Sequence, residues 1–404
     1  MSVNSRLQIF SSSLIPHPSS LLFGLDALPL TETRTGVGHY TFELARALAL
    51  LAPAHEFELD YPSSYPPFRL QNENEPPLPP NLRAARISVG FIRKHWWSIG
   101  LPAYIRRRRL SLFHGTNYDV PLWKPCPTVL TIHDLSLLLH PATHEARRVR
   151  RARRRLPLMA RAATMIITPT ESVRREVCEH LRVSPSKVVA VAEAPRRIFR
   201  PLSRAETGET RARLNVEGDF LLAVGTVEPR KNLLTLVRAF DELLRHAPAL
   251  SRLQLVIAGA TGWLTDELHA RVSASPARGQ IHFTGYLSER DLCALYSSCL
   301  AFVYPSLYEG FGLPPLEAAA CAAPVICGDI PALRESLGDT ARLFPPTHAD
   351  ALTRAILDLI DNPDERARLA SAGQQRASQF TWERTARLTL DVYEEALRGA
   401  AKQP

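Results

Sequence analysis

The chain has 404 residues, of which 45% are hydrophobic and 22% charged, and its formal net charge is +9. This composition is typical of a folded globular protein and excludes collagen, coiled coils and wholesale disorder, while the length favours two domains over one. No stretch approaches the roughly 18 consecutive apolar residues of a membrane-spanning helix, so we expect no helix that crosses a bilayer.

Residues 1–20 lack periodicity and predict a disordered tail, without the cationic block and cleavage pattern of a signal peptide. The six cysteines form no C-x-x-C pair and have no histidine at zinc-site spacing. We expect them to be scattered buried thiols in a reducing compartment, which predicts a cytoplasmic protein.

The first half of the chain alternates short apolar runs with amphipathic ones. The run "LLFGLDALPL" predicts a strand, and "GVGHYTFELARALALLA" predicts a helix after a glycine-containing turn, with Tyr40, Leu44 and Leu48 on one face. Residues 61–80 contain seven prolines and predict a surface loop. Further buried strands are predicted at residues 112–114, 128–132 and 165–168.

A second series of short apolar strands, each followed by a helix-like segment, occupies the second half. The strands are predicted in "FLLAVGT", "LQLVIAG", "QIHFTG", "LAFVYPS" and "APVICG". The economical interpretation is two doubly wound, Rossmann-like α/β domains joined near residue 196. Ligands are then expected in a cleft between the domains, at the carboxyl ends of the strands.

The strongest motif is "YEGFGLPPLEAAACAAPVI", which follows the strand predicted at residues 301–304. Glu309 falls in the strand-to-helix turn, and Glu317 is expected in the first helical turn, beside free N–H groups that favour an anion. Because carboxylates accept hydrogen bonds from hydroxyls, the pattern fits a nucleotide sugar. The alternative is a capping glutamate and a solvated acid. The intervening turn consists of Gly310, Phe311, Gly312 and Leu313.

A basic pair follows the first strand of the second half, in "AVGTVEPRKNLLTLVRAF". Arg230 and Lys231 precede an amphipathic helix, where they would hold a diphosphate and stabilise its charge as the glycosidic bond breaks. Solvated surface charge is the alternative, but the position after a strand favours binding.

Two further motifs lie in the first half. In "TVLTIHDLSLL", His133 and Asp134 end an apolar strand, where buried polar side chains need partners. A core histidine is the alternative. In "TRTGVGHY", Gly36 and Gly38 precede a helix, although a lone G-x-G is common in tight turns.

Together these motifs resemble retaining glycosyltransferases of family 4, which have the GT-B fold and include bacterial polysaccharide and lipid glycosyltransferases. The resemblance covers about residues 21–400, with the motifs in the family's order. It implies an acceptor-binding domain at residues 21–196, completed by a returning helix at about 381–404. It implies a nucleotide-sugar-binding domain at residues 197–380.

The resemblance also implies roles for individual residues. Glu309 would contact the transferred sugar and Glu317 the ribose, as the two acids of an E-x7-E motif. Asn117 and Asp134 would face the acceptor. The catalytic set would be His133, Arg230, Lys231 and Glu309. The other donor-binding residues would be Gly36, Gly38, Gly310, Phe311, Gly312 and Leu313.

The implied enzyme is a retaining hexosyltransferase of cell-surface glycan biosynthesis. It would move mannose or rhamnose from a nucleotide sugar to a lipid-linked or polysaccharide acceptor. No D-x-D triplet occurs, so we expect neither a metal ion nor another cofactor. The connecting sequence "VAEAPRRIFRP" lacks the Asn-Gly-Val-Asp that is frequent in the family. An alternative is a nucleotide-sugar isomerase or hydrolase that uses the same pocket.

Positive charge is concentrated in residues 93–161, with 15 Lys or Arg against three acids. A nucleic-acid-binding protein would interleave stacking aromatics, but residues 141–163 contain none, so we expect no nucleic-acid partner. Two interpretations remain, a peripheral contact with an anionic inner membrane and an amphipathic helix packed on its own domain. The predicted apolar stripe of that helix is Ala146, Val149, Ala152, Leu156 and Met159.

Overall fold

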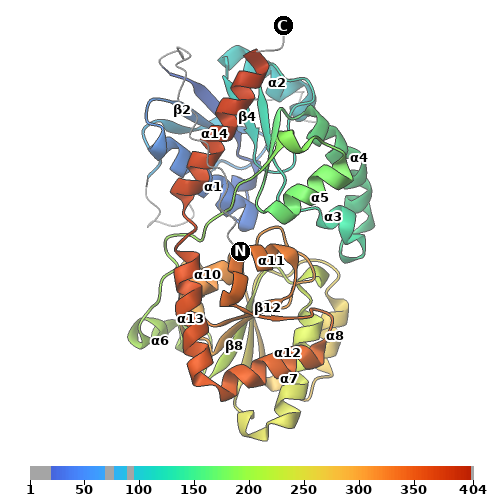
Figure 1. The fold of residues 1–404 in the computed structure, drawn as a ribbon, viewed down its shortest axis with the longest axis vertical. Coiled ribbons are helices and arrows are strands. Elements are labelled where there is room, and N and C mark those ends of the chain that lie inside the picture. Colours follow the sequence, from blue (N-terminus) through green and yellow to red (C-terminus); the bar gives the residue numbers. More distant parts are fainter. Residues whose placement is uncertain (1–19, 69–76, 89–94, 402–404) are drawn as a thin grey trace, which may run out of the picture.

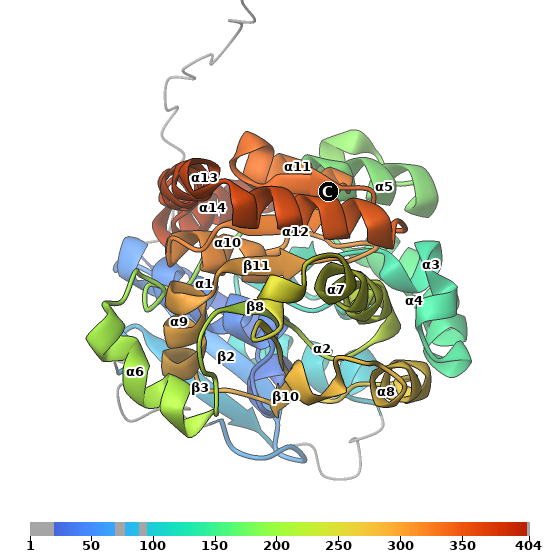
Figure 2. The ribbon, with the colours of Figure 1, turned by 90° about the horizontal axis from the view of Figure 1, so that it is seen from below.

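The computed structural model describes residues 20–68, 77–88 and 95–401. These residues form two α/β domains, one above the other in Figure 1. Each domain contains one parallel sheet with helices on both faces, as Figure 2 shows for the second domain. The predicted fold class, two doubly wound Rossmann-like domains, is therefore confirmed.

The first sheet has the order β3-β2-β1-β4-β5-β6-β7 among the described residues, with every neighbouring pair parallel. The order reverses between β1 and β4, which is where ligands bind in open α/β sheets. The strands are β1 Leu22–Asp26, β2 Glu56–Pro62, β3 Leu82–Ile87, β4 Leu112–Gly115, β5 Thr128–Thr131, β6 Met165–Thr168 and β7 Val188–Ala190.

The second sheet has the order β10-β9-β8-β11-β12-β13 in the part of the chain that the structure describes. Its order reverses between β8 and β11, so the loops after these two strands lie side by side at the carboxyl edge. The strands are β8 Phe220–Val224, β9 Gln254–Ala258, β10 Ile281–Gly285, β11 Ala301–Tyr304, β12 Val325–Gly328 and β13 Arg342–Phe344.

The helices connect successive strands across the faces of the two sheets. Those of the first half are α1 Gly36–Leu51, α2 Leu101–Arg108, α3 Ser136–Leu139, α4 Ala146–Ala162 and α5 Glu171–Leu181. Those of the second half are α6 Arg204–Arg213, α7 Leu233–His246, α8 Asp266–Ser273, α9 Glu289–Ser298, α10 Leu313–Ala320, α11 Pro331–Leu337, α12 Ala349–Asp361 and α13 Pro363–Ala377.

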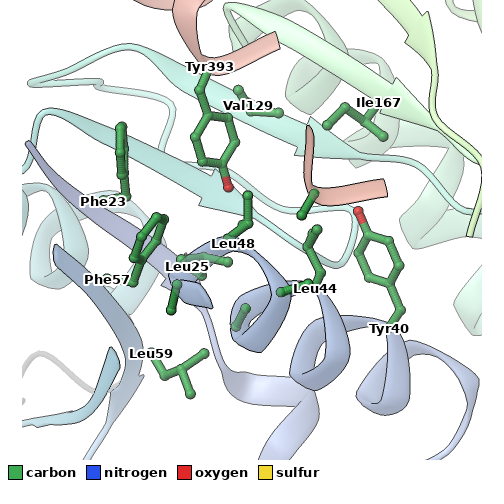
Figure 3. Close-up of a cluster of buried hydrophobic side chains, with 14 of the residues drawn as sticks. Phe23, Leu25, Tyr40, Leu44, Leu48, Phe57, Leu59, Val129, Ile167 and Tyr393 are labelled. Atoms are coloured by element: carbon green, nitrogen blue, oxygen red, sulfur yellow. The ribbon is translucent and has the colours of Figure 1, made fainter. Parts of the chain in front are cut away.

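The last helix, α14 (Trp382–Ala401), leaves the second domain and packs against α1 and the first sheet (Figure 1). Its buried Tyr393 lies among Phe23, Val129 and Leu48 in the core of the first domain (Figure 3). The Tyr393 hydroxyl is 2.8 Å from Nδ1 of His114 on β4. The carboxyl-terminal helix therefore contributes to the first domain's core and ties the two domains together.

Strands β2, β3 and β7 of the first sheet and β13 of the second were not expected from the sequence. The surface loop expected at residues 61–80 begins inside β2, and its residues 69–76 lie outside the described residues, as do residues 1–19 of the expected tail. The strand β2 was missed because two charged residues interrupt its apolar sequence pattern. Glu58 and Asp60 are nevertheless buried, at 1% exposure each. Burial raises the pKa of Asp60 well above its usual range, which favours the neutral acid.

The cysteines are less uniformly buried than expected. Cys126, Cys178 and Cys299 are half-buried, and Cys293 and Cys321 are neighbours with sulfur atoms 3.8 Å apart. All six are free thiols.

The arginine-rich helix α4 packs its apolar stripe into the first domain. Val149, Leu156 and Met159 are buried, whereas Ala146 is exposed and Ala152 half-buried. The apolar face is therefore covered by the protein itself, and arginines form the exposed face. Within the described ranges, no helix is both long and apolar enough to cross a membrane.

Candidate functional site

The basic pair lies in a short 3-10 turn, Pro229–Lys231, directly after β8. Asn232 ends this turn with a φ of 56°, and its side chain donates to the carbonyls of Pro305 (3.0 Å) and Pro346 (2.6 Å). These bonds fasten the loop after β8 to the loops after β11 and β13. The reversal of strand order thus brings the basic pair next to the glutamate that follows β11.

Glu309 binds both cations of the pair. Its Oε1 accepts hydrogen bonds from Nζ of Lys231 (2.6 Å) and the hydroxyl of Tyr304 (2.9 Å). Its Oε2 lies 2.9 Å from Nη1 of Arg230. A second carboxylate, that of Glu228, accepts a 2.6 Å hydrogen bond from Arg230. Two cations and two carboxylates therefore form one compact buried network.

The charges in this network are stabilised mutually. Burial alone would raise the pKa of Glu309, but Arg230 and Lys231 outweigh it and lower the pKa to about 2. Burial also lowers the pKa of Lys231, against the effect of Glu309. Glu309 is thus a fully ionised and weakly basic carboxylate at neutral pH.

The turn after Glu309 brings the two domains into contact. A Cβ atom on Gly310 would lie 1.8 Å from the carbonyl oxygen of His133, so only glycine fits there. The Gly310 carbonyl accepts a 2.9 Å hydrogen bond from the hydroxyl of Thr170 in the first domain. Gly312 has a φ of 95°, which side-chain-bearing residues rarely adopt, and begins α10.

Helix α10 differs in two ways from its expected geometry. It starts at Leu313, so Glu317 lies in the second turn and not in the first. Pro314 and Pro315 carry no N–H, so the anion-binding amides expected at the helix start can come only from the turn before them. Among the described residues, no protein acceptor takes the N–H groups of Gly310, Phe311 or Gly312.

Glu317 is held by an arginine that the motif search did not single out. Arg196, in the segment that joins the domains, donates from Nε to Oε1 of Glu317 at 3.0 Å. It also donates to Glu289 of α9 at 2.6 Å and lies 3.1 Å from Nε2 of His39 on α1. Glu317 is 5% exposed, and burial raises its pKa while Arg196 opposes the rise.

The glycine motif of the first domain begins α1. A Cβ at Gly36 would meet nothing within 4 Å, whereas one at Gly38 would lie 2.9 Å from the carbonyl oxygen of Pro29. Close packing thus excludes a larger residue at position 38, whereas the space beside Gly36 at the start of the helix is open. Thr35, which precedes the helix, makes no side-chain capping bond within the described residues, which leaves N–H groups of the first turn without this acceptor.

His133 is buried, and both of its ring nitrogens have protein partners. Nδ1 lies 3.2 Å from Glu193 and Nε2 lies 2.9 Å from the carbonyl oxygen of Thr116. Both partners only accept hydrogen bonds, so both contacts require the protonated ring. Burial would lower the pKa of His133, but Glu193 outweighs it and raises the pKa. A ring nitrogen could contact a sugar only if one of these bonds broke.

Asn117 and Asp134 line a groove of about 430 Å³ beside α4. The groove also includes Arg148 and Arg151 of α4 and one residue of the second domain, Trp263. The Trp263 indole donates a 2.9 Å hydrogen bond to the carbonyl of Thr143, and the guanidinium of Arg148 lies 4.8 Å from its ring centre. Both domains therefore form this groove.

The structure thus brings most of the sequence-predicted residues into one region. Arg230, Lys231 and Glu309 form a single network, and the turn from Gly310 leads to Glu317. His133 borders this turn from the first domain through its backbone. Sequence reasoning missed Arg196, Glu289, His39 and Trp263. Within the described ranges, no group of three or more His, Cys, Asp or Glu side chains is arranged to hold a metal ion.

Two family profiles match the chain, one on each domain. The profile described as "Glycosyltransferase Family 4" matches residues 34–192. The profile described as "Glycosyl transferases group 1" matches residues 207–376. The first matched segment contains every described strand of the first sheet except β1, and the second contains the described strands of the second sheet. The connection that contains Arg196 lies between the two segments.

Two curated relatives come from Escherichia coli. O-antigen chain mannosyltransferase B is 29% identical over 375 residues, which cover 90% of this chain and 97% of that protein. The serotype-specific mannosyltransferase WbdA is 29% identical over 242 residues, which cover 59% of this chain but only 29% of that protein. The chain therefore spans nearly the whole of one relative and under a third of the other.

Solved structures with the same architecture include sucrose-phosphate synthase from Thermosynechococcus elongatus. It gives a TM-score of 0.74 and 22% identity and covers 94% of this chain and 100% of that one. Anabaena HepE, in complex with UDP and glucose, gives a TM-score of 0.71 and 17% identity. It covers 94% of this chain and 100% of that one. These identities establish the fold alone. Because a glycosyltransferase profile matches each domain and a full-length relative spans both, the chain belongs to the glycosyltransferases with the GT-B fold and resembles mannosyltransferases.

Proposed function

We propose that this glycosyltransferase moves a hexose from a nucleotide sugar to a glycan or lipid-linked acceptor in cell-surface glycan synthesis. The proposed reaction retains the anomeric configuration and needs neither a metal ion nor another cofactor. The observation that carries the proposal is the pairing of Glu309 with both Arg230 and Lys231 at the point where the strand order of the second sheet reverses.

This network can exchange one anion for another. In the protein alone, the carboxylate of Glu309 pairs with both cations, and Glu228 pairs with Arg230. A diphosphate carries more negative charge and accepts bidentate hydrogen bonds from an arginine, so it can take over the cations and leave Glu309 to accept hydrogen bonds from the sugar. The unpaired amides of the turn from Gly310 to Gly312 add donors for the same anion.

In the proposed step, the bond between the anomeric carbon and the diphosphate oxygen breaks. An acceptor hydroxyl oxygen attacks the same face of the sugar, and its proton passes to the departing diphosphate. Arg230 and Lys231 stabilise the charge that develops on the leaving group. A carboxylate with a pKa of about 2 is a poor base and is held by two cations, which favours orientation of the sugar by Glu309 over nucleophilic attack.

The proposed donor sugar follows from the relatives. Two of them are named mannosyltransferases, which favours mannose, with rhamnose as the second candidate. The relatives' names do not specify the nucleotide base of the donor, and the HepE structure contains UDP. The thermal-shift comparison of GDP-, dTDP- and UDP-sugars therefore decides the base.

The proposed acceptor site is the groove that Asn117 and Asp134 line. Against the effect of burial, Glu309 and then Asp134 raise the pKa of Arg230, which supports a short separation between this groove and the basic pair. Arg148 and Arg151 line the groove from α4, and they form no ion pair with a carboxylate in the described part of the chain. This distribution favours an acceptor that presents a hydroxyl inside and an anionic group outside.

The proposal includes a peripheral contact with the cytoplasmic face of an anionic membrane through residues 93–161, of which 93 and 94 lie outside the described residues. Because the apolar stripe of α4 is buried, the contact would be electrostatic. Flotation with anionic vesicles at low salt should therefore succeed and should fail at high salt; no binding at low salt would exclude the contact. The exposed arginines of α4 are Arg147, Arg148, Arg150, Arg151, Arg153, Arg154 and Arg161.

The donor is tested by thermal-shift measurements with GDP-mannose, dTDP-rhamnose and UDP-glucose. A ligand at about 100 times its dissociation constant adds about 2.7 kcal/mol to stability, so the matching donor should raise Tm clearly. Product analysis with and without an acceptor then separates transfer from hydrolysis, and chelation by EDTA should leave the rate unchanged. A protein that responds to none of the three would contradict the proposal.

A further inference from the structure

The connection between the domains places a buried guanidinium against one oxygen of Glu317. Arg196 is 8% exposed. Its Nε donates to Oε1 of Glu317 at 3.0 Å, and its Nη2 lies 2.9 Å from the same oxygen. Within the described residues, Oε2 of Glu317 has no hydrogen-bond partner. The arginine therefore fixes the carboxylate through one oxygen and leaves the other for a ligand.

The guanidinium is itself held by three neighbours. Nη1 donates to Oε1 of Glu289 at 2.6 Å and lies 3.1 Å from Nε2 of His39. Burial, with Arg196 and Arg34 as further causes, lowers the pKa of His39 to about 2, so the ring is neutral and can accept this hydrogen bond. The ring of Phe199 lies 4.6 Å from the guanidinium carbon. Arg196 therefore has little freedom to move.

Arg196 also balances two carboxylates, of which Glu317 is buried and Glu289 half-buried. Glu289 and Glu317 are 19% and 7% exposed in their side chains, and Arg196 forms an ion pair with each. Without the arginine, burial and mutual repulsion would favour protonation of one carboxylate, as expected for unpaired buried acids. A protonated or displaced Glu317 would lose its ability to accept a hydrogen bond in a fixed direction.

We propose that Arg196 is a positioning residue for the donor, which fixes Glu317 so that its Oε2 accepts a hydrogen bond from a ribose hydroxyl. This inference rests on the proposed function, in which Glu317 contacts the ribose of a nucleotide sugar. It also gives a role to the connection between the two domains, in which Arg196 lies.

The test compares how tightly the protein binds a nucleotide with ribose and the same nucleotide without the 2′- and 3′-hydroxyls. Dissociation constants are measured for GDP and UDP and for their 2′,3′-dideoxy analogues. The wild type should prefer one ribonucleotide over its analogue by about tenfold or more, as expected for a lost hydrogen bond to a charged group. Arg196→Met should reduce this ratio to about one, while its affinity for the dideoxy analogue stays within about twofold.

Arg197→Met is the matched control, because Arg197 is the next residue and is 78% exposed. It removes the same charge and should leave the ratio unchanged. Arg196→Lys keeps the charge but cannot bind both Glu317 and Glu289. Its preference for the ribonucleotide over the dideoxy analogue should therefore be intermediate. If Arg196→Met does not fold, Arg196→Lys provides the test.

The outcomes separate the inference from the proposed function. A wild type that binds neither GDP nor UDP would contradict the nucleotide-sugar proposal itself. A wild type that prefers ribose, together with a folded Arg196→Met or Arg196→Lys that keeps the full preference, would overturn the role of Arg196 alone. A preference that is lost equally in Arg197→Met would also overturn it, because the effect would then be one of net charge.

Discussion

Nζ of Lys231 lies 2.6 Å from Oε1 of Glu309, in a pair that joins the loops after β8 and β11. Both side chains are about nine-tenths buried, at 12% and 9% exposure. A buried pair of this kind adds little net stability compared with apolar packing, because both charges lose their hydration. Its location at the carboxyl edge of the sheet therefore favours a functional role.

Replacement of Lys231 by methionine should lower kcat by about 100- to 1000-fold, the cost of one lost transition-state donor. The reason is that Arg230 alone would then stabilise the leaving diphosphate. The measurement is sugar transfer at saturating donor and acceptor. Lys124→Met, at an exposed position of the first domain, is the control and should behave as wild type. Equal turnover in a folded Lys231→Met would exclude Lys231 from the reaction.

Glu309→Gln should separate diphosphate binding from transfer. The variant removes the anion that occupies Arg230 and Lys231, so the affinity for a nucleoside diphosphate should rise several-fold while transfer is lost. Breaking a buried ion pair also costs roughly 3–5 kcal/mol, so folding is checked by circular dichroism. Isothermal titration with GDP and UDP gives the affinity, and weaker binding by a folded variant would contradict the proposed exchange of anions.

Gly310→Ala should disturb the contact between the domains. The new Cβ would lie 1.8 Å from the carbonyl oxygen of His133, so the two loops must separate, and displacement of about 1 Å at a reacting centre can cost about 100-fold in rate. Gly208→Ala is the control, because a Cβ there meets nothing within 4 Å. Gly310→Ala should also lower stability because this overlap must be relieved, whereas Gly208→Ala lies in α6 and should be as stable as the wild type or about 1 kcal/mol more stable. Normal turnover in Gly310→Ala would show that this contact does not position the reacting groups.

His133 should make stability depend on pH. Its pKa is raised in the folded protein, so its interaction with Glu193 is fully present below the usual pKa of about 6.5 and is lost as pH rises through the folded value. Urea unfolding of wild type and His133→Gln should therefore give a larger stability difference at pH 6 than at pH 9. A difference that is equal at the two pH values, or larger at pH 9, would show that the ring is neutral in the folded protein.

Asp134→Asn should affect the acceptor and spare the donor. Asp134 lines the groove assigned to the acceptor, and its loss should raise the acceptor KM while the donor's dissociation constant stays the same. Asp219→Asn, at an exposed position before β8, provides the matched control. If donor affinity fell and the acceptor KM did not change, Asp134 would belong to the donor site.

The sequence was sufficient to predict the strands that carry the proposed chemistry, because each combines a buried apolar run with a glycine or charged loop at its carboxyl end. It did not predict β2, where buried Glu58 and Asp60 interrupt the apolar pattern. It also placed Glu317 one turn too early, since the two prolines were taken to begin the helix, whereas the helix begins before them at Leu313.

Contacts between distant residues were beyond prediction from spacing. Arg196 and Glu317 are 121 positions apart, and Gly310 meets His133 across the two domains. The arginine-rich connection gave no signal that one of its arginines is buried and the next one exposed. That difference depends on which residue faces α9 and α10 after the domains pack, which no local pattern encodes.

The most direct measurement is a crystal structure of the protein with its nucleoside diphosphate, GDP or UDP. The account predicts diphosphate oxygens at about 3 Å from the side chains of Arg230 and Lys231, with a ribose hydroxyl at Oε2 of Glu317. A nucleotide bound elsewhere, with Glu309 still paired to both cations, would contradict it.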